Sequence, residues 1–95
     1  MQIKLQDTVD WMLNGSPAEK LIAEYVQTKI RYDKLHEICV KYEAGTLHFK
    51  PKTDMGHMKE QKMYMGNYLR MLEIRAQIEG VELPKCVYEY NPLPF

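Results

Sequence analysis

Tyrosines interleaved with cationic side chains are the feature of this 95-residue sequence best suited to ligand chemistry. Tyr25 and Tyr32 lie seven residues apart with Lys29 between them. Aromatic rings stack on nucleotide bases, and cationic groups bind phosphates, Arg in a bidentate way. The same rings would suit a core or a subunit interface equally well. The candidate ligand-binding residues are Tyr25, Lys29, Tyr32, Arg70, Arg75, Tyr88 and Tyr90.

Motifs for catalysis or metal binding do not emerge from the sequence. There is no glycine-rich phosphate loop after a strand and no serine nucleophile elbow, and His36, His48 and His57 lack the spacing of a zinc-protease helix. Cys39 and Cys86 have no neighbours at zinc-ligand spacing, so we expect two reduced thiols. We therefore predict a protein that is not an enzyme and that uses no cofactor and no metal.

The charge balance bears on the class of partner. Thirteen basic and thirteen acidic residues cancel, which leaves no broad cationic field for nucleic acid or anionic lipid. The first residues lack a basic start and a continuous apolar core, and no run approaches membrane-spanning length. We expect a cytosolic protein that binds neither DNA nor RNA nor membrane.

The elements that position these residues begin with a helix expected over 16–44. Ser16, Pro17 and Glu19 form a capping start, and Gly45 is a typical stop. Side chains spaced by alternating steps of four and three predict one packing seam. That seam consists of Leu21, Tyr25, Thr28, Tyr32, Leu35, Cys39 and Tyr42.

A second helix is expected from a cap at Thr53 or Asp54 to about Glu79, with Gly80 just past its end. It carries two apolar stripes about 100° apart, of which an antiparallel hairpin can cover only one. We therefore predict a homo-oligomer. The first stripe comprises Met58, Met65, Leu69, Leu72 and Ala76, and the second, expected to form the oligomer interface, comprises Tyr64, Met71, Ile74 and Ile78.

Antiparallel pairing should place facing residues at numbers that add up to about 98, so Arg75 would lie near Glu24 and either pair with it or bind an anion. Gly66 inside the second helix predicts a close helix approach.

The whole chain reads as one all-α domain in three parts. Residues 1–15 form a short N-terminal helix capped by Asp7 or Thr8, ending at Asn14-Gly15 and packing Trp11 on the hairpin. Residues 16–80 form the long antiparallel helical hairpin. Residues 81–95 form an extended, proline-containing C-terminal tail that docks on its own hairpin or on a neighbouring subunit.

Two segments resemble a family of small phage proteins named after a protein of a crAss-like phage. The resemblance covers residues 19–83 and implies an accessory protein in the cytosol of an infected bacterium. Its motifs are helical and indicate a lineage more than an activity. They are Glu24-Tyr25, Lys29, residues 31–35, Gly45-Thr46-Leu47, Gln61, Met65, residues 68–75 and residues 79–83.

Size and architecture are also similar to those of phage helical-hairpin proteins that sequester nucleotide signals of bacterial immunity. This analogy predicts an anti-defence protein that binds a cyclic oligonucleotide or an ADP-ribose-type messenger without turning it over. The alternative is a protein-binding inhibitor of a host defence protein or enzyme that uses the second apolar stripe.

Overall fold

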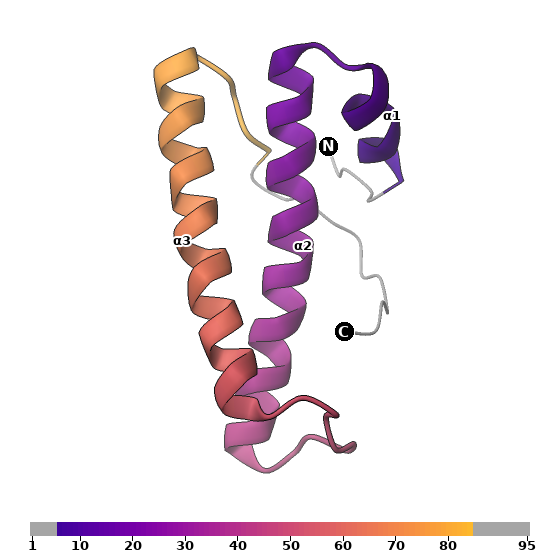
Figure 1. Cartoon of the computed structure of the whole chain (residues 1–95), viewed down its shortest axis with the longest axis vertical. Helices are drawn as coiled ribbons and strands as arrows, with labels where there is room; N and C mark the ends of the chain where they lie inside the picture. Colours follow the sequence, from indigo (N-terminus) through magenta and orange to yellow (C-terminus); the bar gives the residue numbers. More distant parts are fainter. Residues whose placement is uncertain (1–5, 85–95) are drawn as a thin grey trace.

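The computed structural model describes residues 6–84 and is entirely helical in its regular structure there. Helix α1 spans Asp7–Asn14, α2 spans Pro17–Ala44 and α3 spans Met55–Glu79. Figure 1 shows α2 and α3 side by side and antiparallel, with α1 on the side of α2 away from α3. Within these residues no helix is long and apolar enough to cross a membrane. The predicted helical hairpin with a short N-terminal helix is confirmed.

The ends of α2 follow from local chemistry. The Ser16 hydroxyl accepts from the Glu19 N–H at 3.2 Å, and the Glu19 carboxylate accepts from the Ser16 N–H at 3.0 Å. Pro17 occupies the first turn, where no N–H is needed. Gly45 ends the helix with φ +76°, a left-handed conformation that glycine adopts without a Cβ penalty. The predicted start and stop are both confirmed.

The observed caps of α3 agree with the prediction, whereas the observed start of α1 does not. Asp54 accepts from the His57 N–H at 3.2 Å and starts α3, and Gly80, with φ +70°, follows its end, as predicted. In α1, the cap position is Gln6, without a side-chain cap bond, so the prediction of Asp7 or Thr8 is wrong. Thr8 lies within the helix and is fully buried, and its hydroxyl accepts from the Gln27 amide at 2.7 Å. This hydroxyl therefore fastens α1 to α2.

The core runs along the contact between α2 and α3 as two clusters. The first centres on Leu21, Val26, Leu69 and Leu72, and Trp11, Val81 and Leu83 pack against it. The second comprises Leu35, Ile38, Cys39, Met55 and Met58. The predicted docking of Trp11 and of the first tail residues on the hairpin is thereby confirmed.

The predicted seam of α2 is buried at five of its seven positions. Tyr32 is partly buried, and Tyr42 is 50% exposed, so its assignment to the seam is wrong. Tyr42 lies in the last turn of α2.

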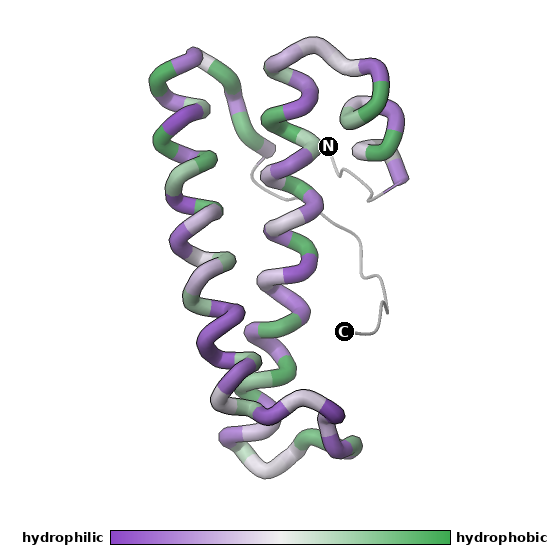
Figure 2. The backbone as a smooth tube through the Cα atoms, in the orientation of Figure 1, coloured by the Kyte–Doolittle hydropathy of each residue, from purple (hydrophilic) through white to green (hydrophobic). Residues whose placement is uncertain are grey.

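The two stripes of α3 have different environments. The first is buried apart from the partly buried Met65. The second is open to solvent: Tyr64 is 60% exposed, Met71 60%, Ile74 40% and Ile78 80%. Figure 2 shows hydrophobic and hydrophilic positions alternating along α3. The hairpin covers one stripe only, as predicted, while association of copies stays a prediction.

The buried stripe supplies a test of this packing. Leu72 is 3% exposed and Met63, on the same helix, is 54% exposed. Leu72→Ala should lower the free energy of unfolding by about 2–5 kcal/mol, because it removes core contacts and leaves a cavity. Met63→Ala should change it by only about 0.5 kcal/mol. Urea unfolding followed by circular dichroism measures both, and equal losses would contradict the packing described.

Candidate functional site

One side of the hairpin gathers aromatic and charged residues from both long helices. We call it the tyrosine flank: Tyr25, Lys29 and Tyr32 from α2, with Lys62, Gly66, Arg70 and Glu73 from α3. The close approach at Gly66 fixes its geometry, since a Cβ added there would lie 3.3 Å from Cε2 of Tyr32. The numbers of these two residues add up to 98, so the predicted register and the predicted close approach are confirmed.

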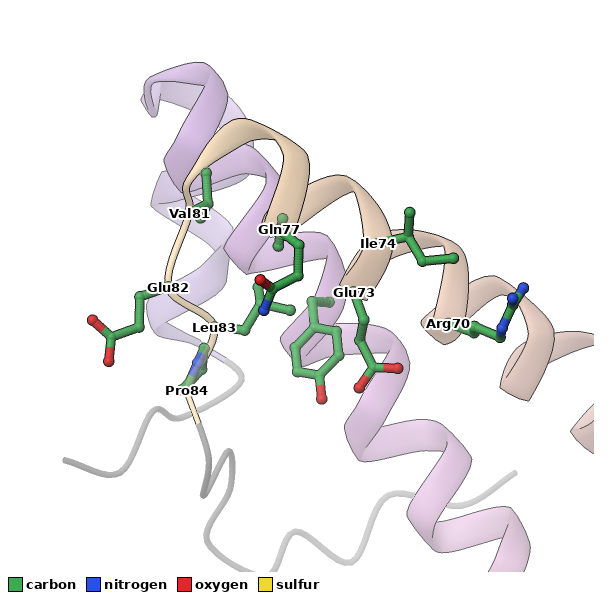
Figure 3. Close-up of a pocket in the computed structure, with 10 residues that line it drawn as sticks. Arg70, Glu73, Ile74, Gln77, Val81, Glu82, Leu83 and Pro84 are labelled. Carbon is green, nitrogen blue, oxygen red and sulfur yellow. The ribbon is translucent and has the colours of Figure 1, made fainter.

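The end of this flank near Gly80 is hollowed into a cavity of about 600 Å³. Tyr25 lies in its wall and is only 8% exposed, so little of its ring is open to a ligand. Figure 3 shows Glu73 and Gln77 reaching from α3 toward α2, with Arg70 and Ile74 at the outer edge and Leu83 and Pro84 on the opposite side. The cavity therefore combines a cation, a carboxylate, an amide and apolar walls.

A second cavity, of about 580 Å³, lies farther along the same flank. Tyr32 lines it together with Lys59 and Lys62. The Lys29 and Lys62 ammonium groups lie 5.7 and 5.9 Å from the centre of the Tyr32 ring, within cation–π range. The His36 ring is nearly parallel to that of Tyr32, at 6.4 Å between centroids. Tyr32 is thus the centre of a cationic cluster.

Protonation states on this flank follow from burial and neighbouring charge. Burial raises the pKa of the Tyr25 hydroxyl, and the Glu73 carboxylate raises it further. Partial burial alone would lower the pKa of Lys29, but the 2.9 Å hydrogen bond to Asp33 and the charge of Asp33 give a net rise. At neutral pH, Tyr25 is therefore a neutral hydroxyl and Lys29 a cation.

The opposite flank holds the other predicted arginine. Arg75 donates to Glu79 at 2.6 Å, and this hydrogen bond raises the pKa of the guanidinium. Glu24 accepts from the Tyr68 hydroxyl, a bond that raises the pKa of Tyr68. Arg75 lies near Glu24, as predicted, and the charge of Glu24 also raises its pKa, but its ion-pair partner is Glu79.

The structure thus brings some predicted site residues together and separates others. Tyr25 and Arg70 share one cavity, and Lys29 and Tyr32 lie on the following turns of α2. Arg75 comes five residues after Arg70, which turns it about 140° around the helix. The two arginines therefore cannot grip one phosphate in a single chain. Tyr88 and Tyr90 lie outside the described residues, as does Cys86.

Three polar residues of the tyrosine flank and its cavity were missed from the sequence: Lys62, Glu73 and Gln77. The hairpin register contains the signal for Glu73, since 25 and 73 add up to 98. Lys62 lies one turn before Gly66 and follows from the same register.

Within residues 6–84, no three His, Cys, Asp or Glu side chains are grouped to hold a metal ion.

The raised pKa of Tyr25 predicts a pH dependence of stability. In the unfolded chain this hydroxyl ionises near its ordinary pKa of 10.0, whereas the folded chain holds it neutral to higher pH. Its contribution to stability is present below pH 10 and is lost as pH rises through the folded-state value. Tyr25→Phe should therefore flatten the fall in urea midpoint above pH 10.

Glu73→Gln provides the matched comparison, because it removes a neighbouring charge and keeps the hydroxyl. NMR of ring-labelled tyrosine should show the pKa of Tyr25 moving down toward 10.0 without reaching it, since burial is the larger cause. An unchanged titration would show that Glu73 does not act on this ring.

A family match covers the part of the chain that builds this flank. The model of the family described as Sequestin matches residues 16–78, which include α2, the connecting loop and all of α3 except its last residue. Comparison with curated proteins found no match, and neither did comparison with solved structures. The relation to a crAss-like phage family stays a prediction. The matched range is about two thirds of the sequence and includes nearly the whole helical hairpin, so the chain belongs to the Sequestin family.

Proposed function

We propose that this protein sequesters a nucleotide-derived second messenger of bacterial immunity, a cyclic oligonucleotide or an ADP-ribose-type signal, without turning it over. It would act as a phage accessory anti-defence protein in the cytosol of the host. The observation that carries the proposal is the cavity lined by Tyr25, Glu73 and Gln77, with Arg70 at its outer edge (Figure 3). The family description supports it in a general way, since its wording suggests sequestration.

Each group in the cavity suits one part of such a ligand. Arg70 makes no ion pair with any of residues 6–84, so its guanidinium can bind a phosphate bidentately. The amide of Gln77 and the carboxylate of Glu73 offer hydrogen bonds to ribose hydroxyls or to a base edge. Ile74 and Leu83 provide apolar walls for a base. In this arrangement Tyr25 is a wall residue with an exposed edge and does not stack face to face on the ligand.

Lys29 and Tyr32 extend the site along the flank. The Lys29 side chain is 33% exposed. Its ammonium group keeps N–H donors beyond the one that it uses in the hydrogen bond to Asp33. A ligand with more than one phosphate would span from Arg70 to the cationic cluster around Tyr32. Tyr88 or Tyr90, which lie outside the described residues, would serve as a lid.

A second candidate function is favoured by the exposed stripe Tyr64, Met71, Ile74 and Ile78. An apolar strip on one helix suits a groove on a host defence protein or enzyme. In that case the free chain would keep the strip open in solution. Copies that cover the strip among themselves would argue against this function.

Calorimetric titration with cyclic dinucleotides, cyclic trinucleotides and ADP-ribose isomers tests the proposed function. We expect one of these classes to bind, and the Arg70→Ala variant to bind it about 10–100-fold more weakly, because a charge-assisted hydrogen bond contributes about 1.5–3 kcal/mol. Chromatography of the recovered ligand should show it intact.

Arg31→Ala is the matched control, since Arg31 is also an exposed arginine but lines neither cavity of the tyrosine flank. The affinity of this control variant for the ligand should equal that of the unaltered protein. Absence of binding heat with all three ligand classes would overturn the proposed function. Equal losses of ligand affinity in the two variants would show that the site does not lie on the tyrosine flank.

A further inference from the structure

The exposed apolar side chains of α3 have a symmetric spacing. Tyr68 is 41% exposed and extends the exposed stripe, and the whole set is Tyr64, Tyr68, Met71, Ile74 and Ile78. The steps along the chain are four, three, three and four residues. With 100° per residue, Tyr64 and Ile78 lie about 20° on either side of Met71, and Tyr68 and Ile74 about 60° on either side. We call this set the α3 strip.

A strip with this spacing is complementary to a second copy of itself. Two identical antiparallel helices can be related by a two-fold axis that passes through Met71. Residues of the two copies then lie at the same height along the helix axes when their numbers add up to 142. Tyr64 is then level with Ile78 of the partner, and Tyr68 is level with Ile74 of the partner. We propose that two copies of the chain pair through the α3 strip, antiparallel, with Met71 on the two-fold axis.

The size of the strip fits such an interface. Five large apolar side chains on each copy, at about 100 Å² each, bring the buried surface to about 1,000 Å², the lower bound for a specific interface. Arg75 lies about 40° around the helix from Met71, within the width of the strip, and is almost level with the ring of Tyr68 of the partner. A cation beside an aromatic ring is a favourable contact. The pairing therefore covers the apolar stripe that the hairpin leaves open.

Pairing also completes the cavity on the tyrosine flank. A two-fold axis perpendicular to the helices keeps equivalent residues on the same side of the interface, so both copies of Arg70 lie on one side. Each is one residue from the axis, and a rise of 1.5 Å per residue places the two guanidinium groups at almost the same height. Ile74 belongs both to the strip and to the wall of the cavity. The partner thus places a second cation about one interhelical distance, about 8–10 Å, from the first, on the side of the interface where each cavity lies.

This arrangement has a consequence that rests on the proposed function. Two adjacent guanidinium groups repel each other, and an anion between them removes the repulsion. A nucleotide phosphate bound there should tighten the pairing, whereas pairing itself depends only on the α3 strip. The two proposals can therefore fail separately.

Cysteine cross-linking tests the pairing directly in a Cys39→Ala, Cys86→Ser background. Met71→Cys should form an intermolecular disulfide with itself under mild oxidation, because only a residue on the axis meets its own copy within disulfide range. Ile78→Cys should not form such a disulfide, since its two copies lie about 20 Å apart along the helix axis. A mixture of Tyr64→Cys and Ile78→Cys chains should cross-link only to each other.

A charge variant gives an independent readout. Met71→Glu should elute as a single chain because it places two carboxylates at the axis, while Val40→Glu, at a 49% exposed site on α2, should elute like the unaltered protein. Circular dichroism checks that both variants are folded. Met71→Cys cross-linking no better than Ile78→Cys, or a single chain for the unaltered protein, would overturn the proposed pairing, whatever calorimetry shows of the ligand.

Discussion

Helix α3 carries more apolar surface than one partner helix can cover, and this constraint shapes the rest of the structure. Its first stripe packs on α2 and builds the core with Leu69, Leu72 and Ala76. Its second stripe stays in solvent, with Ile78 80% exposed. Exposed apolar surface costs free energy in water, so it favours association with something that covers it. Both candidate partners, a second copy or a host protein, arise from this one excess.

The close approach of the helices at Gly66 sets where charged groups meet. With no side chain at Gly66, the Tyr32 ring can lie against the α3 backbone, and this fixes the register of the two helices. The same register sets Glu73 beside Tyr25 and puts Arg70 at the outer edge of the cavity. A shift of one helical turn would separate these groups by about 5 Å. The geometry of the proposed site is therefore a consequence of helix packing.

The sequence predicts the helices well because their ends depend on local chemistry. Ser16 with Glu19, Asp54, Gly45 and Gly80 each act within a few residues, so a start or a stop can be read directly. The weak start of α1 lacks such a side-chain cap. Its first turn is fixed instead by the bond between Thr8 and Gln27, which are 19 residues apart and come together only in the fold.

The candidate site is less predictable, because it depends on which flank of the hairpin each side chain occupies. Arg70 and Arg75 look equivalent in sequence, yet five residues of helix place them on opposite flanks. Choosing between Glu24 and Glu79 as the partner of Arg75 also requires side-chain geometry, since both carboxylates are near. Tyr25 and Arg70 share a cavity only after residues 81–84 fold back over the hairpin, as Figure 3 shows for Leu83 and Pro84.

The central claim is that this hairpin holds a nucleotide signal intact at a site that a second copy completes. Native mass spectrometry of the protein after incubation with each nucleotide class tests it most directly, because one spectrum reports subunit number and bound mass together. The account predicts two chains with unaltered nucleotide bound. A single chain of 11.3 kDa without ligand, or ligand recovered as cleaved fragments, would contradict it.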